Sequence, residues 1–337
     1  MKVLQIGGGS MGTRRMRDLI KIGKLDVALF DKREDRRKRA REQFSIPVFD
    51  TFDRAIKEFS PEVLVISTPP DQHDYYVRFA VENGLHHFCE ASIWTYNYDF
   101  VMKNAAEKKL VAAPSNTMIF LPIVKKLKEI INSGILGKVQ SWHMFLSTYE
   151  PAWHSDEGRE YYARKRETSA GRDMLAFELT YLWDILGRDF SSVYAHIGRR
   201  GETTGNFEDC WNIIVKGGDR LAGSFSLLIG SRRVMRKGWI AGIKGIAEFD
   251  ILKGLLEVTD DDTHGEVYRC GTQREVLEDA YFEEIALFIN AVKGKSNWPL
   301  NYMDNAMITA ITAAVEKSYR SGKEERVDIT SQPSLDW

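Results

Sequence analysis

A run of small and acidic residues near the start of the chain has the spacing of a dinucleotide site. Gly7, Gly9 and Gly12 follow a short apolar run, and Asp31 lies 19 residues after Gly12, at the end of a second apolar run. The first glycine allows a tight turn, the second lets backbone N–H groups approach a pyrophosphate, and the third lets a helix pack closely on a strand. Asp31 can accept hydrogen bonds from a ribose 2′-hydroxyl, so we predict that this segment binds a dinucleotide.

The elements that must position these residues follow from the apolar pattern. Val3–Ile6 is predicted as a buried strand, residues 13–20 as a helix, and Val27–Phe30 as the next strand. The amide groups of Ser10 and Met11 at the helix start then face the phosphates. Two alternatives remain: a glycine turn in another βαβ unit, which would not need the acid, and an Asp31 carboxylate that is merely solvated.

Asp31 favours NAD, because its charge repels the 2′-phosphate of NADP. Lys32 and Arg33 follow directly and could bind that phosphate, which leaves NADP open. Both are part of a run of arginine, lysine, aspartate and glutamate at residues 32–39. We interpret this run as a solvated helix face rather than a nucleic-acid site.

Length and composition set the class of protein. With 337 residues, two domains are expected. The hydrophobic content of 43% and the net charge of −1 give no general attraction to nucleic acid or to anionic membranes. Three scattered cysteines and a start that leads straight into a strand favour a cytoplasmic protein, and no apolar segment is long enough to span a membrane.

The order of elements predicts the fold class. Up to residue 121, strands and helices alternate with short connections, which is typical of a doubly wound parallel sheet of the Rossmann type. From residue 122 to 337, most segments read as strands joined by tight turns, with helices near 123–131, 174–186, 278–293 and 302–321. We therefore predict an NAD(P)-binding domain over 1–121 and an α+β domain with a mostly antiparallel open sheet over 122–337.

The chain resembles the glucose-fructose oxidoreductase, inositol dehydrogenase and MocA (Gfo/Idh/MocA) family of NAD(P)-dependent oxidoreductases. The motifs that carry the resemblance are Ile6–Gly12, Asp31, Ser67–His73, Gly84–Glu90, Pro122, Trp153-His154, Tyr161-Tyr162, and Glu178–Asp184. The resemblance implies hydride transfer between nicotinamide and a sugar carbon, with substrate bound between the domains and a side chain moving the hydroxyl proton. It also implies a C-terminal sheet that often serves oligomerisation, as a homodimer or homotetramer.

Strand ends supply the other predicted cofactor residues. Thr68, Pro69 and Pro70 would shape the floor under the ribose, largely through their backbone. His73 is interpreted as a helix residue near the cofactor rather than as a catalyst. Glu90 is given a nicotinamide-ribose or backbone-positioning role, with a surface charge as the alternative.

Two family positions are changed in this chain. Ala91 stands where the family has a lysine, and Tyr181 stands where it has an acid/base histidine. Tyr181 could replace the histidine if a cation such as Arg164, Lys165 or Arg172 lowered the usual phenol pKa of about 10. Asp184 follows on the same helix face, at a position that contacts substrate in the family. The alternative for Tyr181 is a core aromatic.

His154, beside Trp153 and Tyr161, is the predicted substrate-lining residue, because sugars stack on aromatic rings and are oriented by polar side chains. A packed loop is the alternative. No metal site is expected, since the histidines lack ligand spacing.

These features predict a sugar, nucleotide-sugar or cyclitol oxidoreductase that uses NAD, with Tyr181, Asp184 and His154 as catalytic candidates. The alternative is a dinucleotide-binding sensor or partner subunit without turnover.

Overall fold

The computed structural model describes residues 1–93, 96–154, 161–218, 221–260 and 265–329. Contacts divide the chain into two compact units. One is Met1–Thr117 with Asp279–Ala306, and the other is Met118–Glu278 with Met307–Trp337. The predicted boundary at residue 121 placed 279–306 with the C-terminal domain, whereas contacts group this segment with the N-terminal unit.

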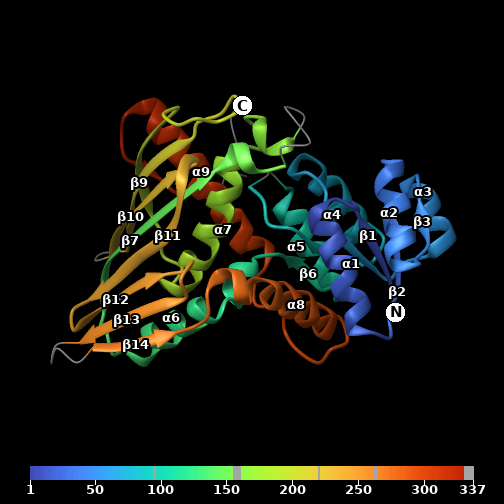
Figure 1. Ribbon diagram of the computed structural model, residues 1–337, viewed down its shortest axis with the longest axis horizontal. Helices are drawn as coiled ribbons and strands as arrows, with labels where there is room; N and C mark the ends of the chain where they lie inside the picture. Colours follow the sequence, from blue (N-terminus) through green and yellow to red (C-terminus); the bar gives the residue numbers. More distant parts are fainter. Residues whose placement is uncertain (94–95, 155–160, 219–220, 261–264, 330–337) are drawn as a thin grey trace. The chain divides into compact units, whose positions relative to one another are not determined.

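The N-terminal unit is built on the predicted parallel sheet, which has six strands in the order β3-β2-β1-β4-β5-β6. Figure 1 labels β1, β2, β3 and β6 of this sheet. The order reverses direction between β1 and β4, the switch point at which such sheets bind ligands. Its strands are β1 (Lys2–Ile6), β2 (Asp26–Phe30), β3 (Val48–Phe49), β4 (Val63–Ile66), β5 (His86–Cys89) and β6 (Ala112–Pro114).

Helices cover both faces of this sheet. The helices after the first five strands are α1 (Ser10–Ile22), α2 (Glu34–Phe44), α3 (Phe52–Arg54) with its π-helical continuation η1 (Ala55–Phe59), α4 (His73–Glu82) and α5 (Tyr98–Glu107). After β6 the chain leaves the unit, so other segments must cover the remaining apolar surface. Ile285 and Phe288 of α8 (Gln273–Val292) pack with Phe88 on one face, and Tyr302 at the start of α9 (Tyr302–Ser321) packs with Cys89 on the other.

The C-terminal unit contains a nine-stranded sheet in the order β14-β13-β12-β11-β7-β10-β9-β8-β15. All neighbours are antiparallel except β7 and β10, which confirms the predicted mostly antiparallel sheet. Its strands are β7 (Val139–Tyr149), β8 (Ser192–Gly198), β9 (Cys210–Gly217), β10 (Leu221–Leu228), β11 (Gly230–Gly242), β12 (Gly245–Asp250), β13 (Leu255–Asp260), β14 (Gly265–Arg269) and β15 (Glu325–Arg326).

One face of this sheet is covered and the other is open. Helices α6 (Pro122–Ser133) and α7 (Ala170–Ile185) belong to this unit, and Tyr181 of α7 reaches Met144 of β7. Along β9, buried and exposed residues alternate. Ile214 of β9 is 56% exposed, and its partner Tyr194 of the neighbouring strand β8 is 45% exposed. The alternation is what a half-covered antiparallel sheet requires.

Three differences from the sequence prediction have local causes. Helix α8 begins at Gln273 rather than 278, because the Thr272 amide and hydroxyl both donate to Glu275, a capping arrangement that the apolar pattern does not reveal. Strands β14 and β15 were not predicted, since their side chains are mostly exposed and lack apolar alternation.

Among the described helices, none is long and apolar enough to cross a membrane.

Candidate functional site

The glycine turn after β1 has the close approaches that the sequence predicted. Gly7 has φ of +89°, and a Cβ there would lie 2.6 Å from the Ser67 carbonyl oxygen. A Cβ on Gly12 would lie 1.9 Å from the Gly7 carbonyl oxygen. Neither position can therefore hold a side chain without moving the backbone.

Gly9 is different, because the three atoms nearest to a Cβ there would all belong to the flexible Arg36 side chain. The nearest atom to a Cβ at Gly9 would be a guanidinium nitrogen of Arg36, 3.6 Å away. Gly9 is also the N-cap of α1, and no side chain caps this helix end. The first-turn amides, including those of Ser10 and Met11, thus carry no side-chain cap, and the Arg36 guanidinium adds positive charge beside Gly9, as suits an anion site at a helix N-terminus.

Asp31 at the end of β2 faces the glycine turn. Its carboxylate accepts hydrogen bonds from the Gly8 amide at 2.6 Å and the Arg33 amide at 2.7 Å, and Arg36 lies 3.6 Å away. It is 6% exposed. A freely solvated carboxylate, the alternative considered above, is therefore not what the structure contains. Two carboxylate oxygens accept about four hydrogen bonds, so capacity for a ribose hydroxyl remains.

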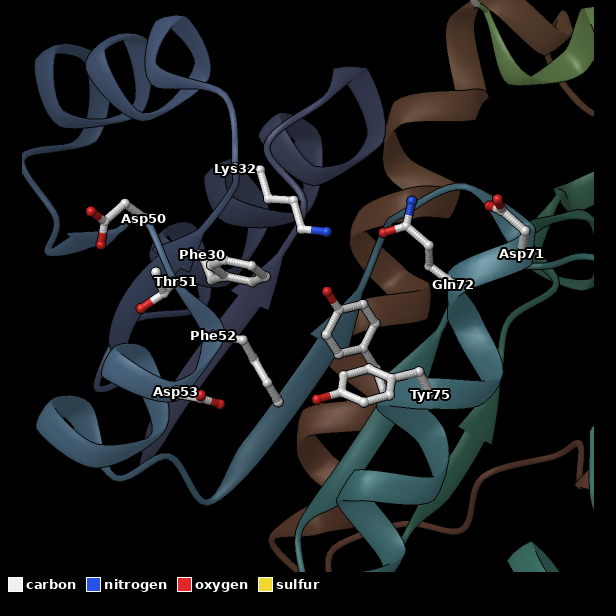
Figure 2. Close-up of a pocket in the computed structure, with 10 residues that line it drawn as sticks. Phe30, Lys32, Asp50, Thr51, Phe52, Asp53, Asp71, Gln72 and Tyr75 are labelled. Atoms are coloured by element: carbon white, nitrogen blue, oxygen red, sulfur yellow. The ribbon is translucent and has the colours of Figure 1, made fainter.

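A cavity of about 620 Å³ lies at the carboxyl ends of β2 and β3 and the start of α4, lined by Phe30 and Lys32, the chain neighbours of Asp31 (Figure 2). Lys32 and Gln72 border it, and Phe30, Phe52 and Tyr76 form an aromatic cluster in its wall, with ring centroids 5.1 to 6.5 Å apart. Its acidic lining residues are Asp50, Asp53 and Asp71. Aromatic rings suit a flat heterocycle, whereas three carboxylates oppose an added phosphate.

The two cations considered for a 2′-phosphate lie in different surroundings. Lys32 borders the cavity, whereas the exposed Arg33 guanidinium binds Asp35 with an N–O distance of 2.7 Å.

The residues predicted to form a ribose floor follow β4. Thr68 and Pro69 lead into the short helix η2 (Pro70–Gln72), and His73 begins α4. The His73 ring contacts the Thr68 carbonyl oxygen at 2.8 Å and the Ser92 hydroxyl at 3.1 Å. Burial lowers the pKa of His73, so the ring is neutral and ties two strand-end loops together. These contacts favour the interpretation as a helix residue over that of a catalyst.

Glu90, at the end of β5, is held by two neighbours. Arg15 of α1 binds it in a bidentate pair at 2.7 and 3.0 Å, and the Ser67 hydroxyl donates at 3.1 Å. The Glu90 side chain is 14% exposed. A loosely solvated surface charge does not describe it, and its fixed geometry suits a positioning role.

Tyr181 in α7 is completely buried. Its hydroxyl donates to Glu178 at 2.9 Å, and Glu178 pairs with Arg236 of β11 at 2.5 Å. Burial and the Glu178 charge raise the pKa of Tyr181 well above 10, although Arg236 opposes this. A role as acid/base would have required a nearby cation to lower the pKa of Tyr181. The surroundings thus favour the core-aromatic alternative.

Two of the three cations named for Tyr181 bind other partners, and the third, Lys165, is exposed. Arg164 pairs with Glu150 at 2.6 Å, and Arg172 pairs with Glu316 at 2.6 Å. Arg236 of β11 acts on Tyr181 instead, and it lies 55 residues after Tyr181 in the sequence.

Asp184 points to cations at the end of α7. It binds Lys128 of α6 at 2.6 Å and Arg188 at 2.9 Å. Burial would raise the pKa of Asp184, but these two cations lower it overall. Asp184 is therefore ionised and engaged at neutral pH.

His154 has a backbone φ of +43°, which is unusual for a residue with a side chain. Its ring lies 4.6 Å from that of Tyr161, whose ring lies 4.8 Å from that of Tyr162. The part of this loop at residues 155–160 lies outside the described residues. The predicted grouping of His154 with Tyr161 is present.

Asp173 is a candidate that the sequence analysis did not name as functional. It lies in the first turn of α7 and accepts a hydrogen bond of 2.8 Å from the Tyr162 hydroxyl. Burial raises the pKa of Asp173 to about 7, although the Tyr162 hydrogen bond opposes this. An acid that titrates near neutrality beside an aromatic loop can take or give a proton. The sequence signal that could have identified Asp173 is an acidic residue within the mostly apolar helical segment at 170–185.

No group of histidine, cysteine and acidic side chains suited to a metal ion occurs within the described parts of the chain.

Comparison with known proteins identifies the family. Residues 1–112 match the oxidoreductase family with an NAD-binding Rossmann fold, GFO_IDH_MocA, and residues 124–248 match a C-terminal domain of that family. The chain belongs to the Gfo/Idh/MocA family. This confirms the predicted family and, with it, an NAD-binding oxidoreductase fold.

Solved structures of other proteins share the fold over nearly the whole chain. An Agrobacterium radiobacter oxidoreductase, solved with NAD+, L-tartaric acid and magnesium, has a TM-score of 0.85, covers 98% of this chain and 99% of its own, and is 16% identical. Levoglucosan dehydrogenase, solved with NADH and levoglucosan, has a TM-score of 0.83 with 97% and 99% coverage at 16% identity.

A curated relative is the 2,7-anhydro-N-acetylneuraminate hydratase of Mediterraneibacter gnavus. It is 25% identical over 133 residues, which make up 39% of this chain and 34% of that protein. The match thus spans about a third of the relative's length.

Proposed function

We propose that this protein is an NAD(H)-dependent oxidoreductase acting on a hydroxyl or ketone of a sugar, nucleotide sugar or cyclitol. The observation that carries the proposal is the uncapped start of α1 at Gly9, with the Asp31 carboxylate turned toward the same glycine turn. The bound nicotinamide would supply the hydride chemistry. Gly7, Gly9, Gly12 and the amides of Ser10 and Met11 would hold the pyrophosphate.

The other cofactor contacts follow from the strand ends. Asp31 would bind the adenosine ribose, with Lys32 and Arg33 beside it. Thr68, Pro69, Pro70 and His73 would shape the ribose floor, and Glu90 would orient the nicotinamide half. The acidic lining of the neighbouring cavity supports NAD over NADP.

The sugar-like substrate class is supported by two features. His154, Tyr161 and Tyr162 place aromatic and polar groups together, as carbohydrate sites require. Structures with this fold include levoglucosan dehydrogenase with levoglucosan and with L-sorbose.

The proton would move through a side chain of the C-terminal unit. Tyr181, Asp184 and His154 remain the sequence-based candidates, and Asp173 with Tyr162 joins them because the pKa of Asp173 lies near neutrality. A positioned acid/base contributes roughly 10²–10⁴-fold to rate, so substitution separates these candidates.

The decisive experiment compares Gly9→Ala with Gly198→Ala. Both positions have φ outside the left-handed region and no atom within 3.5 Å of the added Cβ, so both variants should fold. We expect NADH affinity, measured by calorimetry, to fall at least about tenfold in Gly9→Ala, because the methyl group occupies the phosphate approach. Gly198→Ala should bind like the wild type. A wild type that binds neither NAD+ nor NADH would overturn the proposal.

Turnover should then be measured on a panel of sugars and cyclitols with two readouts. Absorbance of reduced cofactor reports net oxidation, and substrate conversion reports reactions in which the cofactor is regenerated. The second readout is needed because the relative from Mediterraneibacter gnavus is named a hydratase.

A second candidate function is a dinucleotide-binding sensor or partner subunit without turnover. Ala91 and the buried Tyr181 favour it, because neither offers an accessible ionisable group. Restoring the family residues with Ala91→Lys and Tyr181→His should then create activity, whereas ordinary turnover by the unmodified protein would exclude this candidate.

We further propose that the open face of the nine-stranded sheet forms a homodimer or homotetramer contact. The exposed Tyr194 and Ile214 side chains support it. Sedimentation of the wild type and of an Ile214→Lys variant tests it: a monomer in both cases would contradict the proposal.

A further inference from the structure

A buried guanidinium in the N-terminal unit is shared by two glutamates. Arg15 binds Glu90 at 2.7 and 3.0 Å and Glu284 at 2.6 Å, and its remaining nitrogen donates to the Tyr281 carbonyl at 3.2 Å. Glu284 also accepts hydrogen bonds from Ser115 at 2.7 Å and from Thr117 at 2.6 Å. Every polar group of this cluster therefore has a partner.

The cluster lies at the carboxyl ends of the strands of the parallel sheet. Glu90 follows β5, Ser115 follows β6, and Ser67, which also donates to Glu90, follows β4. Arg15 reaches these strand ends from α1 and Glu284 from α8. The carboxyl ends of β4, β5 and β6 are thus joined by one hydrogen-bonded network.

The charges in this network do not balance. Burial alone would lower the pKa of Arg15, but Glu90 and Glu284 raise it, so the guanidinium is cationic. Burial and the Glu90 charge raise the pKa of Glu284, but both of its oxygens accept hydrogen bonds, from Arg15, Ser115 and Thr117, which is the arrangement of an ionised carboxylate. Two carboxylates share one guanidinium, which leaves one excess negative charge.

The side chains packed around the network do not supply a buried positive charge that would neutralise this excess. His73 is neutral, and burial raises the pKa of Tyr281, so its phenol is neutral as well. The Arg14 guanidinium lies over the Tyr281 ring at 4.5 Å, and Arg14 is partly exposed, so solvent screens it. Phe88 covers the inner side of Arg15 at 4.6 Å.

Exposure shows where the excess charge acts. The Arg15 and Glu284 side chains are 0% exposed, whereas Glu90 is 14% exposed. Glu90 Oε1 accepts from both Arg15 and Ser67, but Oε2 accepts only from Arg15 among the hydrogen bonds of the described residues. The network therefore presents its negative charge outward through Glu90.

We propose that the Arg15–Glu90–Glu284 network biases the bound dinucleotide toward its oxidised form. The inference rests on the proposed function: with the pyrophosphate at the turn after β1 and the adenosine ribose at Asp31 after β2, the nicotinamide half extends toward β4 and β5. The oxidised ring carries one positive charge, and uptake of a hydride, a proton with two electrons, removes it. A net negative network favours the charged ring over the neutral one.

Glu284→Gln tests the proposal, because it removes the excess charge at a site that does not touch cofactor. The glutamine oxygen can still accept from Arg15 and Thr117, and its amide can donate to the Ser115 hydroxyl, so the network is retained. We expect NAD+ to bind about three- to tenfold more weakly, and NADH affinity to change by less than about twofold. Calorimetry gives the first dissociation constant and NADH fluorescence gives the second.

Three matched variants separate charge from packing. Ser115→Ala removes a hydrogen bond but no charge, so it should lower thermal stability and leave the NAD+ to NADH affinity ratio unchanged. Glu107→Gln removes an exposed charge on α5 and should change neither. Glu90→Gln provides a second neutralisation if Glu284→Gln does not fold, and it should shift the ratio in the same direction.

An unchanged affinity ratio in a folded Glu284→Gln or Glu90→Gln variant would overturn the inference while leaving the proposed function intact. So would equal weakening of both cofactor forms. A wild type that binds neither form would instead overturn the proposed function, and the inference with it.

Discussion

Each of the two units buries an arginine against glutamate, but the two clusters differ in charge and exposure. In the N-terminal unit, Arg15 serves two carboxylates, and Glu90 is partly exposed at the carboxyl ends of the strands. In the C-terminal unit, Arg236 pairs with Glu178, which also binds Tyr181, and both Glu178 and Tyr181 are 0% exposed.

The difference separates a packed polar cluster from one that can act on a ligand. A buried ion pair by itself is weak evidence of function, since its attraction is largely offset by desolvation. Charge imbalance together with an exposed member distinguishes the Arg15 cluster. Tyr181, which the sequence placed at a catalytic position, lies in the closed cluster.

The largest expected effect comes from removing each arginine. Arg15→Met and Arg236→Met each leave a buried carboxylate without its cation, which should lower the free energy of unfolding by about 3–5 kcal/mol. Urea denaturation measures this loss. Only Arg15→Met should also shift the ratio of NAD+ to NADH affinity, toward NAD+, because the Arg15 network loses its one positive charge. Equal effects of both variants on this ratio would break the comparison between the clusters.

A second test uses pH, because each unit buries a titratable group whose pKa is shifted: that of Asp173 is raised and that of His87 is lowered. Burial raises the pKa of Asp173 to about 7, so between about pH 4 and pH 7 the unfolded chain releases a proton that the folded chain keeps. Its contribution to stability is full below pH 4 and falls by roughly 1.4 kcal/mol per pH unit up to pH 7. Asp173→Asn should remove this slope in urea titrations from pH 5 to pH 8.

His87 in the N-terminal unit has the reverse sign. Burial lowers its pKa to about 3, and its ring contacts the Tyr302 hydroxyl at 3.1 Å. The contribution of His87 is therefore present above about pH 6.5 and is lost as the pH falls toward 3. Between about pH 4 and pH 6.5 the opposite slopes of Asp173 and His87 offset each other, so Asp173→Asn should expose a rise of stability with pH that the wild type does not show. Below pH 4 the variant and the wild type should have the same slope, and a difference there would mean that the two groups are coupled.

The third prediction concerns Tyr181. Tyr181→Phe removes one hydrogen bond from the buried Glu178, which should cost about 1–2 kcal/mol of stability. If Tyr181 belongs to the core, turnover stays within about tenfold of wild type. A loss of 10²–10⁴-fold with an intact fold would instead assign it the acid/base role.

The smallest effect is expected at Asp184. Asp184→Asn removes the ion pairs with Lys128 and Arg188, whose side chains are 47% and 40% exposed. Exposed partners are screened, so we expect a loss of about 1 kcal/mol or less in thermal unfolding. A much larger fall in turnover than in stability would support its predicted contact with substrate.

Much of the N-terminal unit and of its proposed cofactor site could be predicted from the sequence, because the residues that determine them are close together in the chain. Gly7, Gly12 and Asp31 are separated by one strand, one turn and one helix, so spacing alone brings them together. The parallel sheet and the family followed from the same pattern. The segment 279–306 was assigned to the other domain, since nothing local indicates that it covers the surface beyond β6.

The sequence by itself determined the glycine turn, the acid that faces it and the two kinds of sheet. Only the tertiary structure decided that Arg15 holds Glu90 and Glu284, that Arg236 rather than Arg164 or Arg172 lies near Tyr181, and that Asp173 meets Tyr162. Those pairings join residues from separate elements, and burial sets their charges. Neither long-range pairing nor burial can be read from residue spacing along the chain.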